Sequence, residues 1–332
     1  MWKNTLCFLI IPFVITAQES VKFSKTIIAE DLERHINILA SDSLEGRETG
    51  KSGQKMAADY IMNYFKSIGT PPYKRKKYYQ KFKIRSDRLS RILKKKVVVK
   101  GENVLGYIEG TDLKNELLVI SAHYDHLGKK DSLIFNGADD NASGTAAIME
   151  IAQAFMIAKK EGKGPRRSVL IVAFSGEEKG LLGSKYYTRN PVFPLEKTVA
   201  NLNIDMIGRL DELHQEDPNY IYLIGADRLS QELHDISEQV NEKYIKLELD
   251  YTYNKEEDPN RYYYRSDHYN FAKNNIPVIF YFNGVHEDYH KPTDTIEKID
   301  FYKIQKIARL VFLTAWEVAN KEERIVVDKD KN

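Results

Sequence analysis

The chain of 332 residues contains a single cysteine, so it has no second thiol for an intrachain disulfide. That residue, Cys7, lies inside an N-terminal apolar run and would be lost with it. Without thiols, a zinc ion would have to be held by imidazole and carboxylate groups. Attachment of a lipid to Cys7 is an alternative use of this residue.

A strong charge of one sign is also missing. The 50 basic and 48 acidic residues leave a formal charge of +2, so the total charge indicates neither nucleic acid, nor a membrane surface, nor a polyanionic substrate. Residues 70–100 are basic and rich in tyrosine, as in some RNA-binding surfaces. The balanced total favours a solvated strand and loop with lysines at an exposed sheet edge instead.

The longest apolar run near the N-terminus, Leu6 to Ile15, is too short for a comfortable membrane span. It follows Lys3 and precedes the small residue Ala17, which is the order found in a signal peptide. We therefore expect residues 1–17 to be removed and the mature domain, 18–332, to be exported to the periplasm or the cell exterior, with no remaining membrane span. A buried N-terminal strand or helix is the alternative.

From Glu102 onward, short β-branched runs alternate with longer runs of helical spacing. Strands that are apolar nearly throughout, as in a sheet covered on both faces, are predicted at 116–123, 168–175, 200–208, 220–226 and 276–282. Helices are predicted at 31–40, 52–68, 144–160, 230–244 and 301–320. The alternation predicts one large three-layer α/β/α domain with a mixed, mostly parallel central sheet.

Histidines and acidic residues gather at the ends of the predicted strands. The segments concerned are SAHYDHLG, NGADDNASG, AFSGEEKG, NIDMIG and HEDYHKPTDT. One carboxylate at a strand end is often only a helix cap. Because ligands of open α/β sheets bind beyond the carboxyl ends of the strands, five such segments indicate one shared site. Their oxygen and nitrogen atoms are ligand types that zinc accepts, and two ions about 3.5–4 Å apart would activate water and polarise a carbonyl.

In these five segments the sequence resembles the secreted co-catalytic zinc aminopeptidases of the bacterial leucyl aminopeptidase type. Relatives of that family are glutamate carboxypeptidase II, the transferrin receptor ectodomain and glutaminyl cyclase. The resemblance covers about residues 103–295, with all motifs in family order. It implies a fold of the zinc-exopeptidase, phosphorylase/hydrolase-like type, two Zn²⁺ per chain, and hydrolysis of peptides that have a free N-terminus. The stretch 78–116 leaves no room for the protease-associated domain that some relatives carry.

The resemblance also implies roles for individual residues. The metal ligands would be His123, Asp139, Glu178, Asp205 and His290, with Asp139 bridging the two ions. Two residues form the catalytic set. Glu177 would be the general base that passes a proton from the zinc-activated water to the leaving amine, and Asp125 would orient the imidazole of His123.

Supporting roles are expected for several neighbouring residues. His126 is expected at the rim or in a structural role, and Asp140 and Asn141 are expected to support the turn and cap the helix that follows. Asp294 is expected to orient a ligand. The candidates for contacts with the substrate or transition state are Ser266, Asp267 and His268. A turn and helix cap is the alternative for those three.

Two other functions stay open. A glutaminyl cyclase has a similar fold and one zinc ion, and a binding ectodomain like that of the transferrin receptor is metal-free. The complete ligand set favours two metal ions and hydrolysis. Carboxypeptidase action on an acidic dipeptide would require an arginine-rich pocket, which the sequence does not identify.

Overall fold

The computed structural model describes residues 13–73, 77–85 and 87–329. The expected leader, 1–17, lies mostly outside these residues. Its last part begins helix α1 (Phe13–Ser24), which packs against α5 (Gly144–Lys160) and α9 (Phe301–Asn320). Among the residues that the structure describes, no helix combines the length and apolar character that a bilayer span requires.

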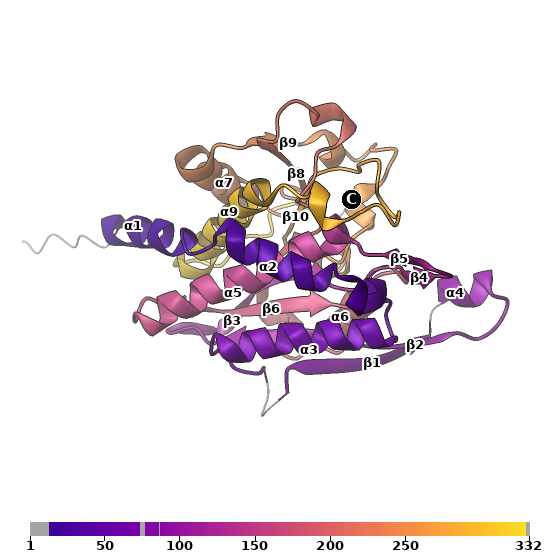
Figure 1. The fold of residues 1–332 in the computed structure, drawn as a ribbon. Helices are drawn as coiled ribbons and strands as arrows, with labels where there is room; N and C mark the ends of the chain where they lie inside the picture. The colour runs from indigo at the N-terminus through magenta and orange to yellow at the C-terminus, as the bar shows by residue number, and fades with distance from the viewer. Residues whose placement is uncertain (1–12, 74–76, 86, 330–332) are drawn as a thin grey trace, which may run out of the picture.

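The centre of the molecule is an eight-stranded mixed sheet with the order β1-β2-β6-β3-β7-β10-β8-β9 (Figure 1). Its strands are β1 (Tyr79–Arg85), β2 (Val98–Ile108), β3 (Leu113–His123), β6 (Arg167–Phe174), β7 (Thr198–Ile204), β8 (Tyr220–Ile224), β9 (Glu248–Asp250) and β10 (Val278–Phe282). A small hairpin is formed by β4 (Gly128–Lys130) and β5 (Leu133–Phe135). The four central strands β6, β3, β7 and β10 run parallel to one another.

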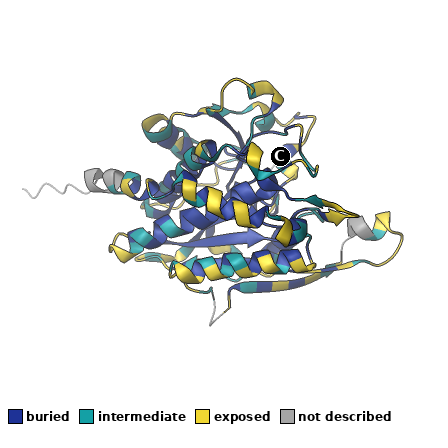
Figure 2. Cartoon of the chain, in the orientation of Figure 1, coloured by how far each residue is buried: buried dark blue, intermediate teal, exposed yellow. Residues whose placement is uncertain are grey.

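Helices cover both faces of this sheet, as the apolar strands predict. One face packs against α2 (Ala29–Leu39), α3 (Ser52–Ser67), α5 and α9, and Figure 1 shows α2, α3 and α5 lying across it. The other face packs against α6 (Leu182–Arg189) and α8 (Tyr269–Ala272). Every residue of β6 is therefore buried, and the strand is dark blue along its length in Figure 2. The predicted three-layer architecture is confirmed.

The predicted helices and strands are confirmed with shifts of a few residues at their ends. The helix predicted at 230–244 is α7 (Gln231–Val240) followed by a wider turn, and α5 and α9 have the predicted bounds. The basic stretch forms β1, which pairs antiparallel with β2 at the sheet edge and exposes Lys81 and Lys83. A short helix, α4 (Asp87–Ile92), was not predicted there.

Strand register brings the carboxyl ends of the parallel strands to one edge of the sheet. His123, the last residue of β3, lies opposite Phe174, the last residue of β6. Ser121 lies opposite Asn203 of β7, and Tyr281 of β10 lies opposite Ile204. Polar residues that follow each strand are thereby placed next to one another, although the sequence separates them widely.

The central strand β3 supplies a test of the core. Ile120 has no exposed surface, so truncation in Ile120→Ala should lower the free energy of unfolding by about 2–5 kcal/mol, since it leaves a cavity. Leu213→Ala is the control, because Leu213 is 65% exposed and its truncation should change stability by no more than about 0.5 kcal/mol. Urea unfolding followed by circular dichroism measures both. Equal losses would contradict the assignment of β3 to the core.

Candidate metal centre

Four of the five predicted metal ligands meet at the carboxyl edge of the sheet. His123 ends β3, and Asp205 directly follows β7. Glu178 lies four residues beyond β6, and His290 lies eight residues beyond β10. Each of these strands fixes its end by hydrogen bonds to its neighbours, so the four side chains start from a rigid frame.

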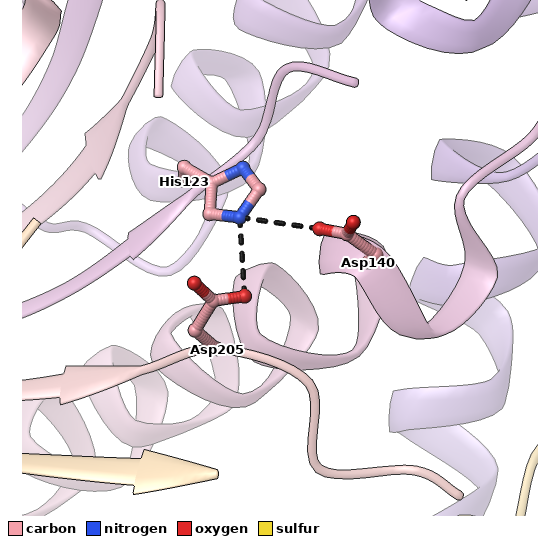
Figure 3. A group of neighbouring side chains, drawn as sticks. All are labelled: His123, Asp140 and Asp205. Carbon is pink, nitrogen blue, oxygen red and sulfur yellow. Dashed lines mark hydrogen bonds and ion pairs between the residues drawn. The ribbon is translucent and has the colours of Figure 1, made fainter. Parts of the chain in front are cut away.

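The first group of candidate ligands consists of His123, Asp140 and Asp205. Nε2 of His123 lies 3.1 Å from Oδ1 of Asp205 and 3.3 Å from Oδ1 of Asp140. Figure 3 shows both carboxylates turned toward this one nitrogen atom. One ligand atom from each residue lies within 4.8 Å of the others. A single metal ion could therefore bind all three residues.

The second group shares Asp140 with the first. Oδ2 of Asp140 lies 3.1 Å from Nε2 of His290, which is itself 3.4 Å from Oε2 of Glu178. His126 completes the group, with its Nδ1 at 2.9 Å from Oε1 of Glu178 and 3.7 Å from Oδ2 of Asp140. The two oxygens of one carboxylate thus face two different sets of nitrogen ligands.

Asp140 takes the position expected for Asp139, which corrects the assignment made from the sequence. Oδ1 of Asp139 accepts a hydrogen bond of 2.6 Å from the main-chain nitrogen of Gly208, and its Oδ2 lies 3.3 Å from Nε2 of His286. The reason is the backbone: Asp140 has φ −104° and ψ 90°, close to an extended conformation. Asp139 keeps a helical backbone and Asp140 does not, so the two side chains leave the chain in different directions and that of Asp140 joins the other ligands.

The loop that carries these acids is held from both sides. The carboxylate of Asp294 accepts hydrogen bonds from the main-chain nitrogens of Asp139 (3.1 Å) and Asp140 (3.1 Å), which gives Asp294 an orienting role toward the loop. Asn141 accepts a hydrogen bond from the nitrogen of Gly144 at the start of α5, and donates one to the carbonyl of Ile204. Asn141 therefore caps the helix as expected, and it also joins the loop to the end of β7.

A buried arginine fixes the loop and the end of β3 relative to each other. Arg47 has no exposed surface, and its guanidinium donates to the carbonyls of Tyr124 (2.7 Å), Asn136 (2.6 Å) and Gly137 (2.9 Å). It also donates to the carbonyl of Leu39 at the end of α2. Burial lowers the pKa of Arg47 to about 10, and the nearby acids oppose this decrease. The charge therefore stays on the guanidinium at neutral pH and partly balances the acids above it.

Asp125 and Glu177 are linked through the backbone. Oδ1 of Asp125 accepts a hydrogen bond of 3.2 Å from the main-chain nitrogen of Glu177, and Oδ2 accepts one of 2.6 Å from the hydroxyl of Thr49. The expected contact with His123 is made mainly by the carbonyl oxygen of Asp125, at 3.1 Å from Nδ1, while its carboxylate lies at 3.8 Å. Asp125 thus positions both the imidazole and the main chain of Glu177.

The three residues expected to contact substrate are buried behind the site. Ser266, Asp267 and His268 are at most 1% exposed. The Ser266 hydroxyl donates to Oδ2 of Asp205 at 2.6 Å, and the carboxylate of Asp267 accepts from the hydroxyl of Ser184. Burial raises the pKa of Asp267 to about 7 and lowers that of His268 to about 3. This corrects the expectation, because their side chains support the site and precede α8 instead of facing the cavity.

Charge around the site is strongly unbalanced in favour of acids. Burial opposes the charged form of every group there, but the carboxylates of Asp205 and Glu177 raise the pKa of His123 well above its ordinary value. Burial raises the pKa of Glu177, and the acids around it add to this effect. Histidines act in the opposite direction on Glu178, whose pKa is lowered to about 2 despite its burial. A cation bound between these acids would offset the repulsion among their negative charges.

The donor set fits a zinc cofactor. Oε1 of Glu178 and both ring nitrogens of His126 are buried, and within the described part of the chain they make no hydrogen bond of acceptable geometry. Buried polar atoms without partners are costly, so each needs an explanation. A metal ion that accepts lone pairs from imidazole and carboxylate supplies one, and neutral imidazole and carboxylate are the ligand types that zinc takes.

A small cavity opens onto the site. Its floor contains His123, Asp140, Glu177, Asp205 and His290. Its walls are apolar or aromatic and consist of Met206, Tyr262, Phe280, Phe282, Val285 and Tyr289. One cation, Arg265, also lines it. A few polar groups below apolar walls are typical of a small-molecule or peptide-end binding site.

Sequence reasoning assigned Asp140 to the turn and helix cap and His126 to the rim or a structural role, whereas the structure places both in the ligand groups; it gave Arg265 no role. The signal for Asp140 and His126 was present, since both lie in the motifs that carry the ligands, but residue order does not reveal which of two adjacent side chains turns inward. Arg265 lies directly before the Ser266–His268 segment and after a run of tyrosines, and such a run is as typical of a protein core as of a binding site. No spacing rule identifies it.

Comparisons with known proteins agree with this geometry. A sequence-family model described as Peptidase family M28 matches residues 103–315. Aminopeptidase YwaD of Bacillus subtilis (strain 168) is 28% identical over 232 residues, which are 67% of this chain and 46% of that protein. The chain therefore spans less than half the length of that relative.

Two solved structures share the fold. The LapA aminopeptidase of Legionella pneumophila aligns with a TM-score of 0.71 at 20% identity, over 97% of this chain and 81% of that chain. The glutaminyl cyclase of Porphyromonas gingivalis aligns with a TM-score of 0.67 at 18% identity, over 87% of this chain and 97% of that chain. At these identities the likeness establishes the architecture only.

The two adjacent acids give a direct test of the site. Asp140→Asn should weaken zinc binding by more than about 100-fold, because even residues that only orient ligands cost 10- to 100-fold when they are changed. Asp139→Asn should retain zinc, since its amide oxygen can still accept from Gly208. Dialysis against a zinc buffer with elemental analysis measures both variants, and circular dichroism checks their folding. Loss of zinc from Asp139→Asn alone would reverse the assignment.

Proposed function

This chain belongs to peptidase family M28, and on that basis we propose that it is a metal-dependent aminopeptidase, an exopeptidase that hydrolyses the N-terminal peptide bond. The observation that carries the proposal is the shared carboxylate of Asp140, whose two oxygens face His123 and His290 in a cavity that also contains Glu177. A carboxylate placed between two ligand groups is what a two-metal peptidase site requires.

We propose two zinc ions per chain. Asp140 would bridge them, with His123 and Asp205 on one side and Glu178 and His290 on the other. His126 would lie close enough to the second ion to join Glu178 as a ligand. Bound zinc would supply Lewis-acid activation of water and of the scissile carbonyl.

Glu177 would move the proton. It lines the cavity with the ligands, yet it belongs to neither ligand group. Its pKa is raised by burial and by the acids nearby, which suits a group that accepts a proton from water and returns it to the leaving amine. The hydrogen bond from its main chain to Asp125 would hold it beside His123 during both transfers.

The substrate would be a peptide with a free N-terminus. Its positively charged amine would lie near the acids of the cavity floor, and its first side chain would lie against the aromatic walls. The alternatives are weaker. A cyclase with one zinc would need only one ligand group, and a metal-free ectodomain would have no use for five histidines and acids, four of them buried, arranged in two groups.

Substitutions of the adjacent residues Glu177 and Glu178 should distinguish a loss of proton transfer from a loss of metal binding. Glu177→Gln should retain both zinc ions and lose about 10²- to 10⁴-fold in kcat, because a general acid-base group contributes about that much. Glu178→Gln should lose zinc and recover part of its activity when zinc is added in excess. The readouts are zinc content and hydrolysis of aminoacyl-nitroanilides.

An N-acetylated substrate is the control for the exopeptidase assignment. Acetylation removes the charge that the acidic floor would bind, so cleavage should be abolished. Hydrolysis of the acetylated substrate would favour an endopeptidase or another hydrolase. Near-normal turnover by Glu177→Gln would refute the assigned mechanism, and a zinc content of one per chain would favour the cyclase.

We also propose that the chain is exported. The support comes from Lys3, the apolar run that follows it, and Ala17. Mass spectrometry of the N-terminus of the natural protein should find a chain that begins at or near Gln18 in the periplasmic or extracellular fraction. An intact Met1 form as the main cellular species would contradict export and would leave the enzymatic proposal unaffected.

A further inference from the structure

Arg265 is the one cationic side chain among the residues that line the cavity, apart from the histidines of the site. It belongs to the exposed rim of the cavity, above a floor made of acids and imidazoles. A guanidinium is always charged and carries its donors in a planar fork. Its position at the mouth of a site that takes peptides therefore bears on which peptides bind.

Two aromatic residues of the cavity hold this guanidinium in place. Its Cζ lies 4.9 Å from the centre of the Tyr262 ring, and its Nη2 donates a hydrogen bond of 3.3 Å to the hydroxyl of Tyr289. Both tyrosines line the same cavity. A side chain fixed by stacking and by one hydrogen bond loses less freedom when it binds a ligand, so its remaining donors are preorganised.

Arg265 has no carboxylate within ion-pair distance in the described part of the chain, whereas two other arginines have polar partners of their own. Arg209 pairs with Asp288 at 2.9 Å, and Arg47 donates to four main-chain carbonyls. The acids of the floor are engaged as well, because Asp205 contacts His123 and the hydroxyl of Ser266. A fixed guanidinium without an internal partner is suited to an anion from outside.

We propose that Arg265 binds a carboxylate of the substrate and makes the site selective for peptides that present one close to the scissile bond. This inference rests on the proposed aminopeptidase function. Two groups could supply the carboxylate: the acidic side chain of the first residue, or the C-terminus of a dipeptide. The recognition chemistry is the same in both cases, a charge-assisted and potentially bidentate hydrogen bond to a planar anion.

The experiment compares matched substrate pairs with the zinc-loaded chain. For the C-terminal source, the pair is leucyl-leucine and its amide. For the side-chain source, the pair is the nitroanilides of glutamate and glutamine. The parent should prefer the carboxylate member of one pair by about 10- to 100-fold in kcat/KM, mainly through KM, which is the size expected for hydrogen bonds to a charged group. The pair that shows the preference identifies the source.

Three variants assign that preference to Arg265. Arg265→Met should remove it, so that kcat/KM for the two members of each pair becomes equal within about twofold. Arg265→Lys should keep part of it, because an ammonium cannot form the planar fork. Arg261→Met is the matched control: Arg261 also stacks on a tyrosine, at 4.8 Å from the Tyr264 ring, but it does not line the cavity. It should behave as the parent.

Equilibrium binding keeps this test separate from turnover. The dipeptide pair and free glutamate and glutamine are titrated calorimetrically into Glu177→Gln, with and without Arg265→Met. A tenfold or larger preference that disappears with Arg265→Met supports the proposal even if the nitroanilides are poor substrates. Equal affinity within each pair, or a preference that survives Arg265→Met, overturns it. Absence of hydrolysis of every peptide by the parent would instead count against the proposed function.

Discussion

The hydrogen bonds of the buried guanidinium of Arg47 connect the segments on which the site depends. The side chain joins the end of α2, the residue after His123 and the loop before Asp139 through four main-chain carbonyls. A carbonyl on its own attracts a cation weakly, and four of them around one buried group leave it only one position. These bonds hold the loop that leads to Asp140 next to the end of β3, which carries His123.

Acids gathered in a buried place would normally destabilise the chain, since each charged group loses solvation. The structure limits this cost in several ways. Asp294 accepts two main-chain N–H groups, Asp205 accepts the hydroxyl of Ser266, and Asp125 accepts that of Thr49. These bonds orient carboxylates before any metal binds, so little rearrangement is needed on binding. Within the motif from Ser266 to His268, Ser266 is the residue that supports Asp205.

The cavity above the ligands combines three kinds of surface within one small volume. Its floor is polar, its walls are aromatic, and its rim carries a fixed cation. The N-terminal end of a peptide has groups that complement the first two surfaces: its charged amine suits the acids of the floor, and an apolar side chain suits the aromatic walls. The tyrosines serve twice, because Tyr262 and Tyr289 form walls and also hold Arg265. Specificity in such a site depends on which of these surfaces a substrate can contact at the same time.

Local patterns in the sequence were enough to predict the layers, the central strands and the segments that carry the chemistry. The strands from Leu117 to His123 and from Arg167 to Phe174 are mostly apolar and are buried along their whole length, which is typical of a sheet covered on both faces. Because the carboxyl ends of parallel strands lie at one edge of a sheet, the meeting of the segments that follow them was predicted from these patterns. The choice of His123, Glu178, Asp205 and His290 within those segments came from the family resemblance.

Tertiary structure decided which side chain of each motif faces the site. Asp139 and Asp140 are the same residue type, so the sequence does not show which of them faces the site. The choice depends on the backbone of the loop, which is held by Asp294, Asn141 and Arg47, residues that lie far apart in the chain. The same holds for Ser266, Asp267 and His268, whose burial results from packing against β7, α6 and β10. Residue type and spacing determine what chemistry a segment can perform. Only contacts between distant segments determine where each atom of that chemistry points.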